Sequence, residues 1–363
     1  IGRARGMGIQ VLPPDLNGSG MDFTVESGSI RFGLSAIKGV GEGAIQGILD
    51  ARERVGQFRS MHELCAEVDA KHANKRVLEA LVFSGALDSL GYGRSTLAAG
   101  VDAALESGHK RRADLEAGQG NLFAGGGDGP EPEHAERLPE TEEWDERTRL
   151  LHEKETLGFY ISGHPLEAHA GLIRDFASHT TDQLSSTPGG SEVAVCGLVT
   201  NLNRRKSRKG DWFATLQLED TQGRVETVIF PKTYKTSGSI LEDDKAFLIT
   251  GRLQVEEDQV KILADDICPL AELRDRKADA VQVRIHAVQL DDTLVEDLRT
   301  TVARHGGDAR LYLEVCRPGR YRFVAQAENA LRVRPSQDLS DDLDRLLGPG
   351  RVRYRAKPSR YER

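Results

Sequence analysis

Residues 34–52 read LSAIKGVGEGAIQGILDAR, and this stretch decides the fold of the first part of the chain. Leu34 and Ile37 have the spacing expected at the end of one helix, and the glycines at 39 and 41 predict a tight hairpin. Apolar side chains then recur at helical spacing and predict one buried face of a second helix: Ala44, Ile45, Ile48 and Leu49. This order is that of a helix-hairpin-helix motif.

Such a hairpin binds DNA through its backbone. Glycines let the chain approach a phosphate closely, and free N–H groups at the start of a helix bind the anion. Val40 is predicted to pack into the core, and Lys38 adds positive charge. The sequence therefore predicts a duplex-binding site that reads no bases, made of Lys38, Gly39, Val40 and Gly41. The alternative is a purely structural pair of helices.

A second, less regular copy of the motif follows at residues 70–87, AKHANKRVLEALVFSGAL. Lys75 and Arg76 stand at the predicted start of its helix, and we add them to the duplex-binding residues. Residues 95–117 then predict one further helix. We expect a helical DNA-binding region over 31–117, preceded at 1–30 by strands and turns.

The segment at 118–140 has the composition of a disordered linker, rich in glycine, proline and acidic residues. An exposed leucine–phenylalanine pair in such a segment is typical of a short motif that docks into an apolar pocket of a partner. We predict that Gln119, Leu122 and Phe123 are such a motif. A loop that folds back onto its own domain is the alternative.

Charge is unevenly distributed along this 363-residue chain. Nine acidic residues stand against one arginine in 128–146, so this segment alone carries the whole net charge of −8. A nucleic-acid partner is therefore not excluded, because local patches set the field that a phosphate meets. A helix is expected to begin near Thr141, with acidic residues in its first turn, and to stop at Gly163. We expect a connecting helix within 141–180.

From residue 191 the apolar period changes to two, and five strands fit within about eighty residues. One short helix or turn, at 232–244, separates the third strand from the fourth. This is the order of an OB-fold, a small barrel that binds single strands or sugars. We place it at 190–272. Alternating strands and helices over 278–357 predict a compact α+β domain, so the fold class is multidomain α+β.

The first two strands of the barrel are predicted to be joined by a basic loop. Positive charge follows a nucleic-acid backbone, and an aromatic face stacks on a base. One of Trp212 and Phe213 should point into the core, and the sequence does not say which. We predict a single-strand site, with a merely solvated loop as the alternative. Its residues are Arg204, Arg205, Lys206, Arg208, Lys209, Trp212 and Phe213.

Catalytic and metal sites are not expected. The stretch LHEKETLG at 151–158 begins like a zinc-protease helix but has Thr156 where the second histidine belongs. The four cysteines are far apart and indicate free thiols in a reducing cytoplasm. No run of apolar residues is long enough for a membrane span, and we expect no membrane partner.

In chain order, these stretches resemble the C-terminal part of the bacterial replicative DNA polymerase III alpha subunits, the family C DNA polymerases. The resemblance covers nearly the whole chain and rests on the ordered series. The matching stretches are MGIQVLPPDLNGSGMDF (7–23), IRFGLSAIKGVGEGAI (30–45), NKRVLEALVFSGALDSLG (74–91), QGNLF (119–123), HEKETLGFYISGHPL (152–166) and GLVTNLNRRKSRKGDWFATLQLED (197–220).

The resemblance implies a role for each part. Residues 1–30 would end the fingers region of the polymerase, and QGNLF would be its internal sliding-clamp motif. The domain at 278–357 would contact a clamp-loader subunit. The palm, with its metal-binding aspartates and Mg²⁺, and the N-terminal domain that would bind the proofreading exonuclease are expected upstream of Ile1. The chain would then belong to a DNA-directed DNA polymerase, a nucleotidyltransferase, but be inactive alone and bind no cofactor.

Other functions stay open at this point. An error-prone paralogue of the same polymerase family is one, although such proteins tend to lack the clamp peptide and the final domain. An independent nucleic-acid adaptor, with no polymerase attached, is another. Small-molecule binding by the barrel is disfavoured by the basic loop.

Overall fold

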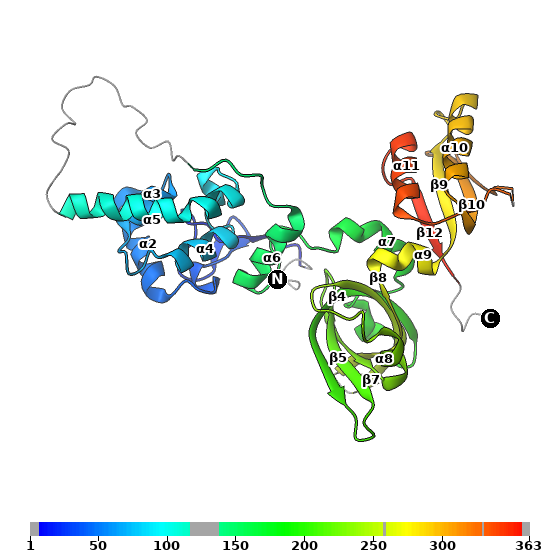
Figure 1. Ribbon diagram of the computed structural model, residues 1–363, viewed down its shortest axis with the longest axis horizontal. Helices are drawn as coiled ribbons and strands as arrows, with labels where there is room; N and C mark the ends of the chain where they lie inside the picture. Colours follow the sequence, from blue (N-terminus) through cyan, green and yellow to red (C-terminus); the bar gives the residue numbers. More distant parts are fainter. Residues whose placement is uncertain (1–6, 117–137, 257–258, 329, 358–363) are drawn as a thin grey trace. The chain divides into compact units, whose positions relative to one another are not determined.

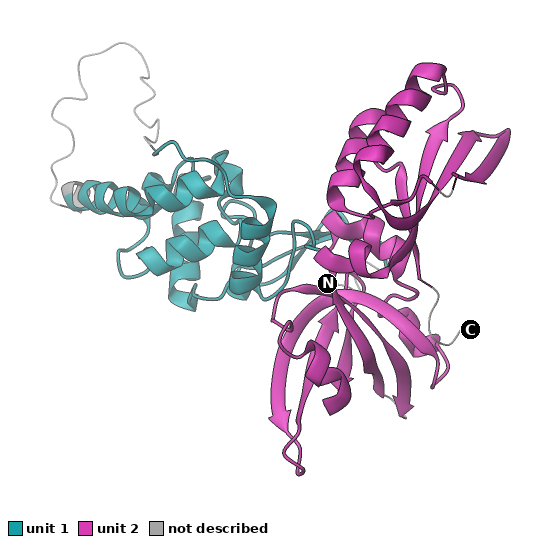
Figure 2. Ribbon diagram, turned by 45° about the vertical axis from the view of Figure 1, so that its right-hand side comes forward, with its two compact units in different colours: residues 1–165 teal, residues 166–363 magenta. Residues whose placement is uncertain are grey.

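The computed structural model describes residues 7–116, 138–256, 259–328 and 330–357. The chain divides into two compact units, residues 1–165 and 166–363, coloured separately in Figure 2. The predicted fold class is confirmed: a helix-hairpin-helix region comes first, a five-stranded OB barrel second, and a small α+β domain last. Gln119, Leu122 and Phe123 lie outside the described residues.

The first unit begins with a small sheet in the order β1-β3-β2, made of β1 (Val11–Leu12), β2 (Thr24–Glu26) and β3 (Ser29–Arg31). The turn after β1 is tied to the helical core. Leu16 is fully buried, and its backbone N–H donates to the Ala86 carbonyl at 2.7 Å. Arg52 donates from Nη1 to the carbonyls of Leu16 and Ser19.

Four helices carry the core of this unit: α2 (Glu42–Val55), α3 (Met61–Glu67), α4 (Lys75–Phe83) and α5 (Arg94–Glu116), seen together in Figure 1. The predicted apolar face of α2 is buried at Ala44, Ile45 and Ile48. The first helix of the motif is shorter than predicted. It is a single 3₁₀ turn, η1 (Leu34–Ala36), because the chain arrives directly from β3.

The connecting helix predicted within 141–180 is not a single element. It is two helices, α6 (Glu146–Leu157) in the first unit and α7 (Ala170–Phe176) in the second. The start at Thr141 was wrong: Asp145 caps α6, and its side chain accepts the N–H of Thr148 at 2.8 Å. Helix α6 ends at Leu157, with Gly158 in the left-handed conformation. Leu157 is buried in the core of the first unit.

The second unit contains a closed barrel in the order β4-β5-β6-β8-β7. Its strands are β4 (Glu192–Lys206), β5 (Trp212–Glu219), β6 (Arg224–Ile229), β7 (Ala246–Glu256) and β8 (Gln259–Pro269). Parallel pairing of β6 with β8 closes it, and α8 (Pro231–Ser237) lies between the third and fourth strands as predicted. Alternate strand residues fill the interior, among them Val195, Leu216 and Ile249.

The α+β domain forms a sheet in the order β11-β10-β9-β12. Its strands are β9 (Ala278–His286), β10 (Gly306–Arg317), β11 (Tyr321–Gln326) and β12 (Val352–Ala356), accompanied by α10 (Asp292–Arg304) and α11 (Gln337–Leu347). A short helix, α9 (Leu273–Lys277), links the barrel to β9. The sequence did not predict β12, which pairs antiparallel with β9. The Asp175 carboxylate of α7 accepts hydrogen bonds from Arg353 and from the Tyr354 backbone.

Candidate nucleic-acid interface

The glycine hairpin leaves the N-terminus of α2 open. Gly39 has φ +96°, a conformation that side chains disfavour, and Gly41 is the N-cap of α2 without a side-chain cap. Within the described residues, the N–H groups of Gly41, Glu42 and Gly43 have no hydrogen-bond acceptor. A Cβ at Gly41 would meet no atom within 4 Å. Free donors, open space and the positive end of the helix dipole together make an anion site.

Side chains of mixed sign surround this hairpin. Val40 is 7 % exposed and packs into the core, so the hairpin is anchored from below while its backbone stays at the surface. Lys38 is exposed, and its backbone N–H donates to the Thr156 carbonyl at 2.8 Å. A Cβ at Gly39 would lie 3.6 Å from Nε of Arg76, which brings that guanidinium beside the hairpin. Arg76 and Gly39 therefore lie side by side, whereas Nζ of Lys38 lies 3.5 Å from a Cβ placed at Gly158, and Glu42 is also exposed.

The second copy of the motif differs from the first at the start of its helix. Asn74 caps α4, and its Oδ1 accepts the Val77 N–H at 3.2 Å, so part of the helix dipole is already satisfied. Lys75 donates to the Asp102 carboxylate at 2.9 Å, and both side chains are exposed. Lys75 therefore brings a neutralised charge to the surface. Its contact with DNA stays a prediction.

The predicted basic loop is shorter than the sequence indicated. Arg204, Arg205 and Lys206 belong to β4, with exposed side chains, and only residues 207–211 form the turn. The Ser207 hydroxyl accepts the N–H groups of Lys209 and Asp211, while Gly210 supplies a positive φ of +85°. The cations are thus carried on a twisted antiparallel hairpin, a stiffer support than a free loop.

Of the two adjacent aromatics, Trp212 is the exposed one. Its side chain is 47 % exposed, whereas Phe213 is half-buried. Nζ of Lys206, the register partner of Trp212, lies 5.0 Å from the centre of the indole ring. The ring attracts this ammonium and so holds one positive charge beside the exposed indole. Trp212 is therefore the residue of this pair that is available for stacking.

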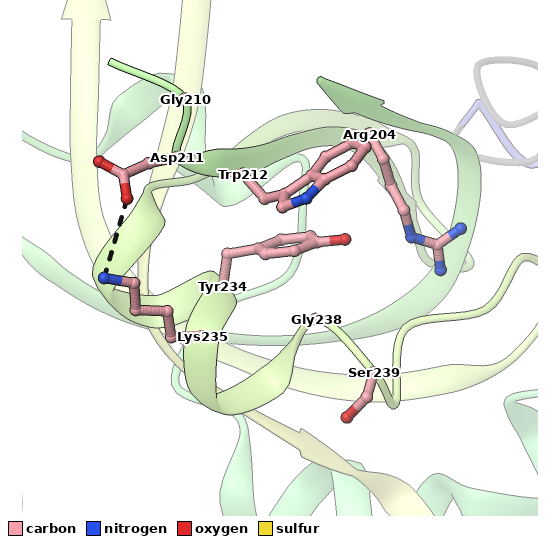
Figure 3. A pocket seen from close by; sticks show the side chains of 8 residues that line it. All are labelled: Arg204, Gly210, Asp211, Trp212, Tyr234, Lys235, Gly238 and Ser239. Carbon is pink, nitrogen blue, oxygen red and sulfur yellow. Dashed lines mark ion pairs between the residues drawn. The ribbon is translucent and has the colours of Figure 1, made fainter. Parts of the chain in front are cut away.

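Trp212 lines a surface cleft of about 620 Å³ together with residues from α8 and the loop after it. Figure 3 shows Trp212 from β5 and Tyr234 from α8 projecting into the cleft, with the Arg204 side chain at one end. Nζ of Lys235 lies 3.8 Å from Oδ1 of Asp211, and Ser239 also lines the cleft. Two aromatic rings with cations around them match the requirements of a stacked base and its phosphates.

Sequence reasoning missed Tyr234, Lys235 and Ser239. They fall within the segment 232–244, which the sequence identified only as a helix or turn between strands. The signal was present in KTYK (232–235), where an aromatic residue stands among lysines as Trp212 stands after Lys209. The sequence did not predict that α8 packs against β5.

The stretch at 151–158 is structural. Glu153 is 1 % exposed and accepts a hydrogen bond from Arg94 at 2.9 Å. His152 stacks on Phe83, with ring centres 4.3 Å apart, and lies 4.5 Å from Trp144. No group of three or more potential metal ligands occurs in the residues that the structure covers. In the same residues, no helix is long and apolar enough to cross a membrane.

Comparison with known proteins places this geometry in a family. Two family models match: a helix-hairpin-helix motif over residues 8–97 and an OB-fold nucleic acid binding domain over 193–270. DNA polymerase III subunit alpha of Vibrio cholerae is 32% identical over 97% of this chain, and that of Escherichia coli K12 is 32% identical over 95%. The Thermus aquaticus protein is 37% identical over 87%.

The chain belongs to the DNA polymerase III alpha subunit family. It spans about 30% of the length of the Vibrio and Escherichia relatives and 25% of the Thermus relative. The domains it carries fit a C-terminal part of DNA polymerase III subunit alpha. The matched OB-fold model covers β4 to β8, so the Trp212 cleft belongs to a nucleic-acid-binding type of domain.

Proposed function

We propose that this chain is the DNA-binding and clamp-binding part of a replicative DNA polymerase, and that it holds DNA while residues elsewhere in the polymerase perform the chemistry. The observation that carries the proposal is the N-terminus of α2, with N–H groups that have no acceptor among the described residues and with the side chain of Arg76 beside the hairpin. Such a site takes a phosphate of any sequence.

Duplex DNA is the ligand proposed for this hairpin. Lys38 and Arg76 supply charge, Gly39 and Gly41 let the phosphate approach, and Val40 acts only as the buried anchor. Lys75 is the weakest member, since Asp102 already neutralises it. The contact would give salt-dependent affinity with no base preference.

Gly41→Val tests the hairpin with little risk to the fold. Gly41 has φ −79° and open space around it, so valine fits there but covers the free N–H groups. Gly171→Val is the matched control, since that glycine also has open space around it and lies in the second unit. We expect Gly41→Val to weaken duplex binding roughly tenfold, equally for unrelated sequences, because one phosphate contact is lost. Unchanged affinity, or a loss confined to one sequence, would contradict the proposal.

Single-stranded DNA is the ligand proposed for the Trp212 cleft. The rings of Trp212 and Tyr234 both line this cleft. The exposed cations of β4 and of the turn after it lie next to Trp212 along the hairpin. Arg205, Arg208 and Lys209 have no ion-pair partner in the described parts of the chain, so their charge is available to a ligand. Phe213, being half-buried, contributes packing rather than stacking.

The partners that we propose beyond DNA are suggested by the sequence and by the resemblance to the polymerase family. We propose that Gln119, Leu122 and Phe123 bind a sliding clamp and that the domain at 278–357 contacts a clamp-loader subunit. Gln119→Ala with Phe123→Ala should abolish clamp capture and leave duplex binding intact. If the double variant captured the clamp as well as the unmodified chain does, the clamp-binding role of these residues would be contradicted. We further propose that the chain alone adds no nucleotides and that Mg²⁺ acts at the polymerase palm.

A further inference from the structure

The sheet of the α+β domain carries polar side chains on one of its faces. Along β9, Val281, Val283 and Ile285 are buried, whereas the alternate residues include Arg284. Parallel pairing places Arg284 directly beside Glu314 of β10. Neighbouring residues in register point to the same side of a sheet. This face therefore bears charged groups at its centre, where β9 and β10 meet.

A cleft of about 480 Å³ lies at the turn between β10 and β11, and its lining includes Arg284 and Glu314 of this face. Arg317 and Tyr321 are register partners at the ends of β10 and β11 and occupy the alternate positions there. Four arginines line it, from three strands and the turn: Arg284, Arg317, Arg320 and Arg322. Tyr321 also lines it and is 53 % exposed. Arginine is the residue best suited to phosphate, because its planar fork of donors matches two oxygens at once.

One carboxylate stands among the lining residues, that of Glu314. Its Oε1 accepts hydrogen bonds or ion pairs from Nε of Arg284 at 2.9 Å and Nε of Arg322 at 3.0 Å. Arg317 and Arg320 make no ion pair with any residue that the structure describes. The lining therefore keeps a net excess of three positive charges, in a chain whose net charge is −8. Unbalanced charge in a hollow attracts an anionic ligand.

We propose that this cleft is a second single-strand site, in which the arginines bind phosphates of a nucleic acid and Tyr321 stacks on a base. Charge alone would fit an acidic peptide equally well. The exposed ring of Tyr321 favours a nucleic acid. A nucleotide can place its phosphate on a guanidinium group and stack its base on the ring, whereas an acidic peptide requires only the positive charge. The site is separate from the α2 hairpin and from the Trp212 cleft.

The test removes the two unpaired arginines, as Arg317→Ser with Arg320→Ser. Neither pairs with Glu314, so the network beneath the cleft is kept. Arg299→Ser with Arg147→Ser is the matched control, because it makes the same change of net charge and both residues are exposed on helices, α10 and α6. Fluorescence anisotropy with an oligothymidine is measured at several salt concentrations, in the otherwise unmodified chain and with Trp212→Ala. Thermal unfolding of each variant checks the fold.

We expect the Arg317/Arg320 variant to bind roughly tenfold more weakly at 0.1 M salt, and its salt slope to fall by about 1.4, since each single-strand phosphate contributes about 0.7. Tyr321→Ala should lower affinity without changing the slope, because stacking carries no charge. The control should match the unmodified chain. The effects should persist with Trp212→Ala, which separates this site from the barrel.

Two results would overturn the proposal. The first is an arginine variant that binds the oligonucleotide as its control does, with the same slope. The second is a polyglutamate peptide that binds the unmodified chain as tightly as the oligonucleotide and loses this binding in the arginine variant. That result would make the partner an acidic peptide.

Discussion

Glu153 offers a sharp test of what holds the helical unit together. Its carboxylate lies in α6 and is 1 % exposed. One oxygen accepts Nη1 of Arg94 at 2.9 Å, and the other accepts the backbone N–H groups of Ile161 at 3.2 Å and Ser162 at 3.1 Å. It thus joins α6 to α5 and to the segment after α6. Glu153→Gln keeps the size of the side chain and removes its charge.

The size of the effect follows from these contacts. Breaking a buried ion pair by changing one partner costs about 3–5 kcal/mol, because the other charge stays buried. Arg94 keeps Asp88, at 2.7 Å and 2.8 Å, so the lower end of that range applies. A loss of about 3 kcal/mol lowers the melting temperature of a unit of this size by roughly 6–12 °C.

Tryptophan fluorescence reports on this unit alone once Trp212 is replaced by phenylalanine, because the chain has two tryptophans. The remaining Trp144 packs on Phe83 and His152, within 5.7 Å and 4.5 Å of their ring centres. Its emission should change as the unit unfolds.

Glu155→Gln, on the same helix with 66% of its side chain exposed, is the control. It should shift the midpoint by less than about 2 °C, since exposed ion pairs contribute little. Equal shifts for Glu153→Gln and Glu155→Gln would refute the view that the buried carboxylate supports the fold.

Three further outcomes are expected. Trp212→Ala should weaken oligothymidine binding about 5- to 150-fold, the loss of roughly 1–3 kcal/mol of stacking, in a fluorescence titration; no loss would mean that the ring is only exposed. Burial raises the pKa of Glu314, but hydrogen bonds from Arg284 and Gln282 outweigh it and keep the pKa below 4.5. The ionised Glu314 carboxylate therefore stabilises the folded state fully above pH 4.5, and this contribution is lost as the pH falls further. Glu314→Gln should flatten the pH dependence of the unfolding midpoint in acid. An unaltered pH dependence would contradict this. Burial raises the pKa of Cys196 to about 12, so half-buried Cys316 should be the first thiol to react with a disulfide reagent at pH 8, as mass mapping would show; prior labelling of Cys196 would contradict it.

Local periodicity predicted the parts of the fold that local interactions determine. The face of α2 and the five barrel strands were correct, because apolar spacing alone specifies them. The start of α6 was wrong because Thr141 and Asp145 are both good N-caps. Tertiary contacts decide between them: the Thr141 hydroxyl lies 2.9 Å from those of Ser95 and Thr96, and Asp145 is left to cap.

Non-local pairing explains the other errors. Strand β12 is five residues long and rich in arginine, and it is a strand because β9 offers an edge some seventy residues earlier. Trp212 lies on the same side of β5 as the buried Ala214 and Leu216, and it is exposed although that side faces the barrel, because it is the first residue of the strand. Tyr234 joins the cleft only because α8 packs on β5. No single stretch of sequence contains that information.

The most direct test of the whole account is the affinity of the unmodified chain for DNA as salt is varied. We predict that it binds duplex and single strands alike, that the logarithm of affinity falls linearly with the logarithm of salt concentration, and that duplex sequence has no effect. Binding to neither form at low salt, or duplex binding that is independent of salt, would contradict the claim that open helix amides and unpaired cations hold the nucleic acid.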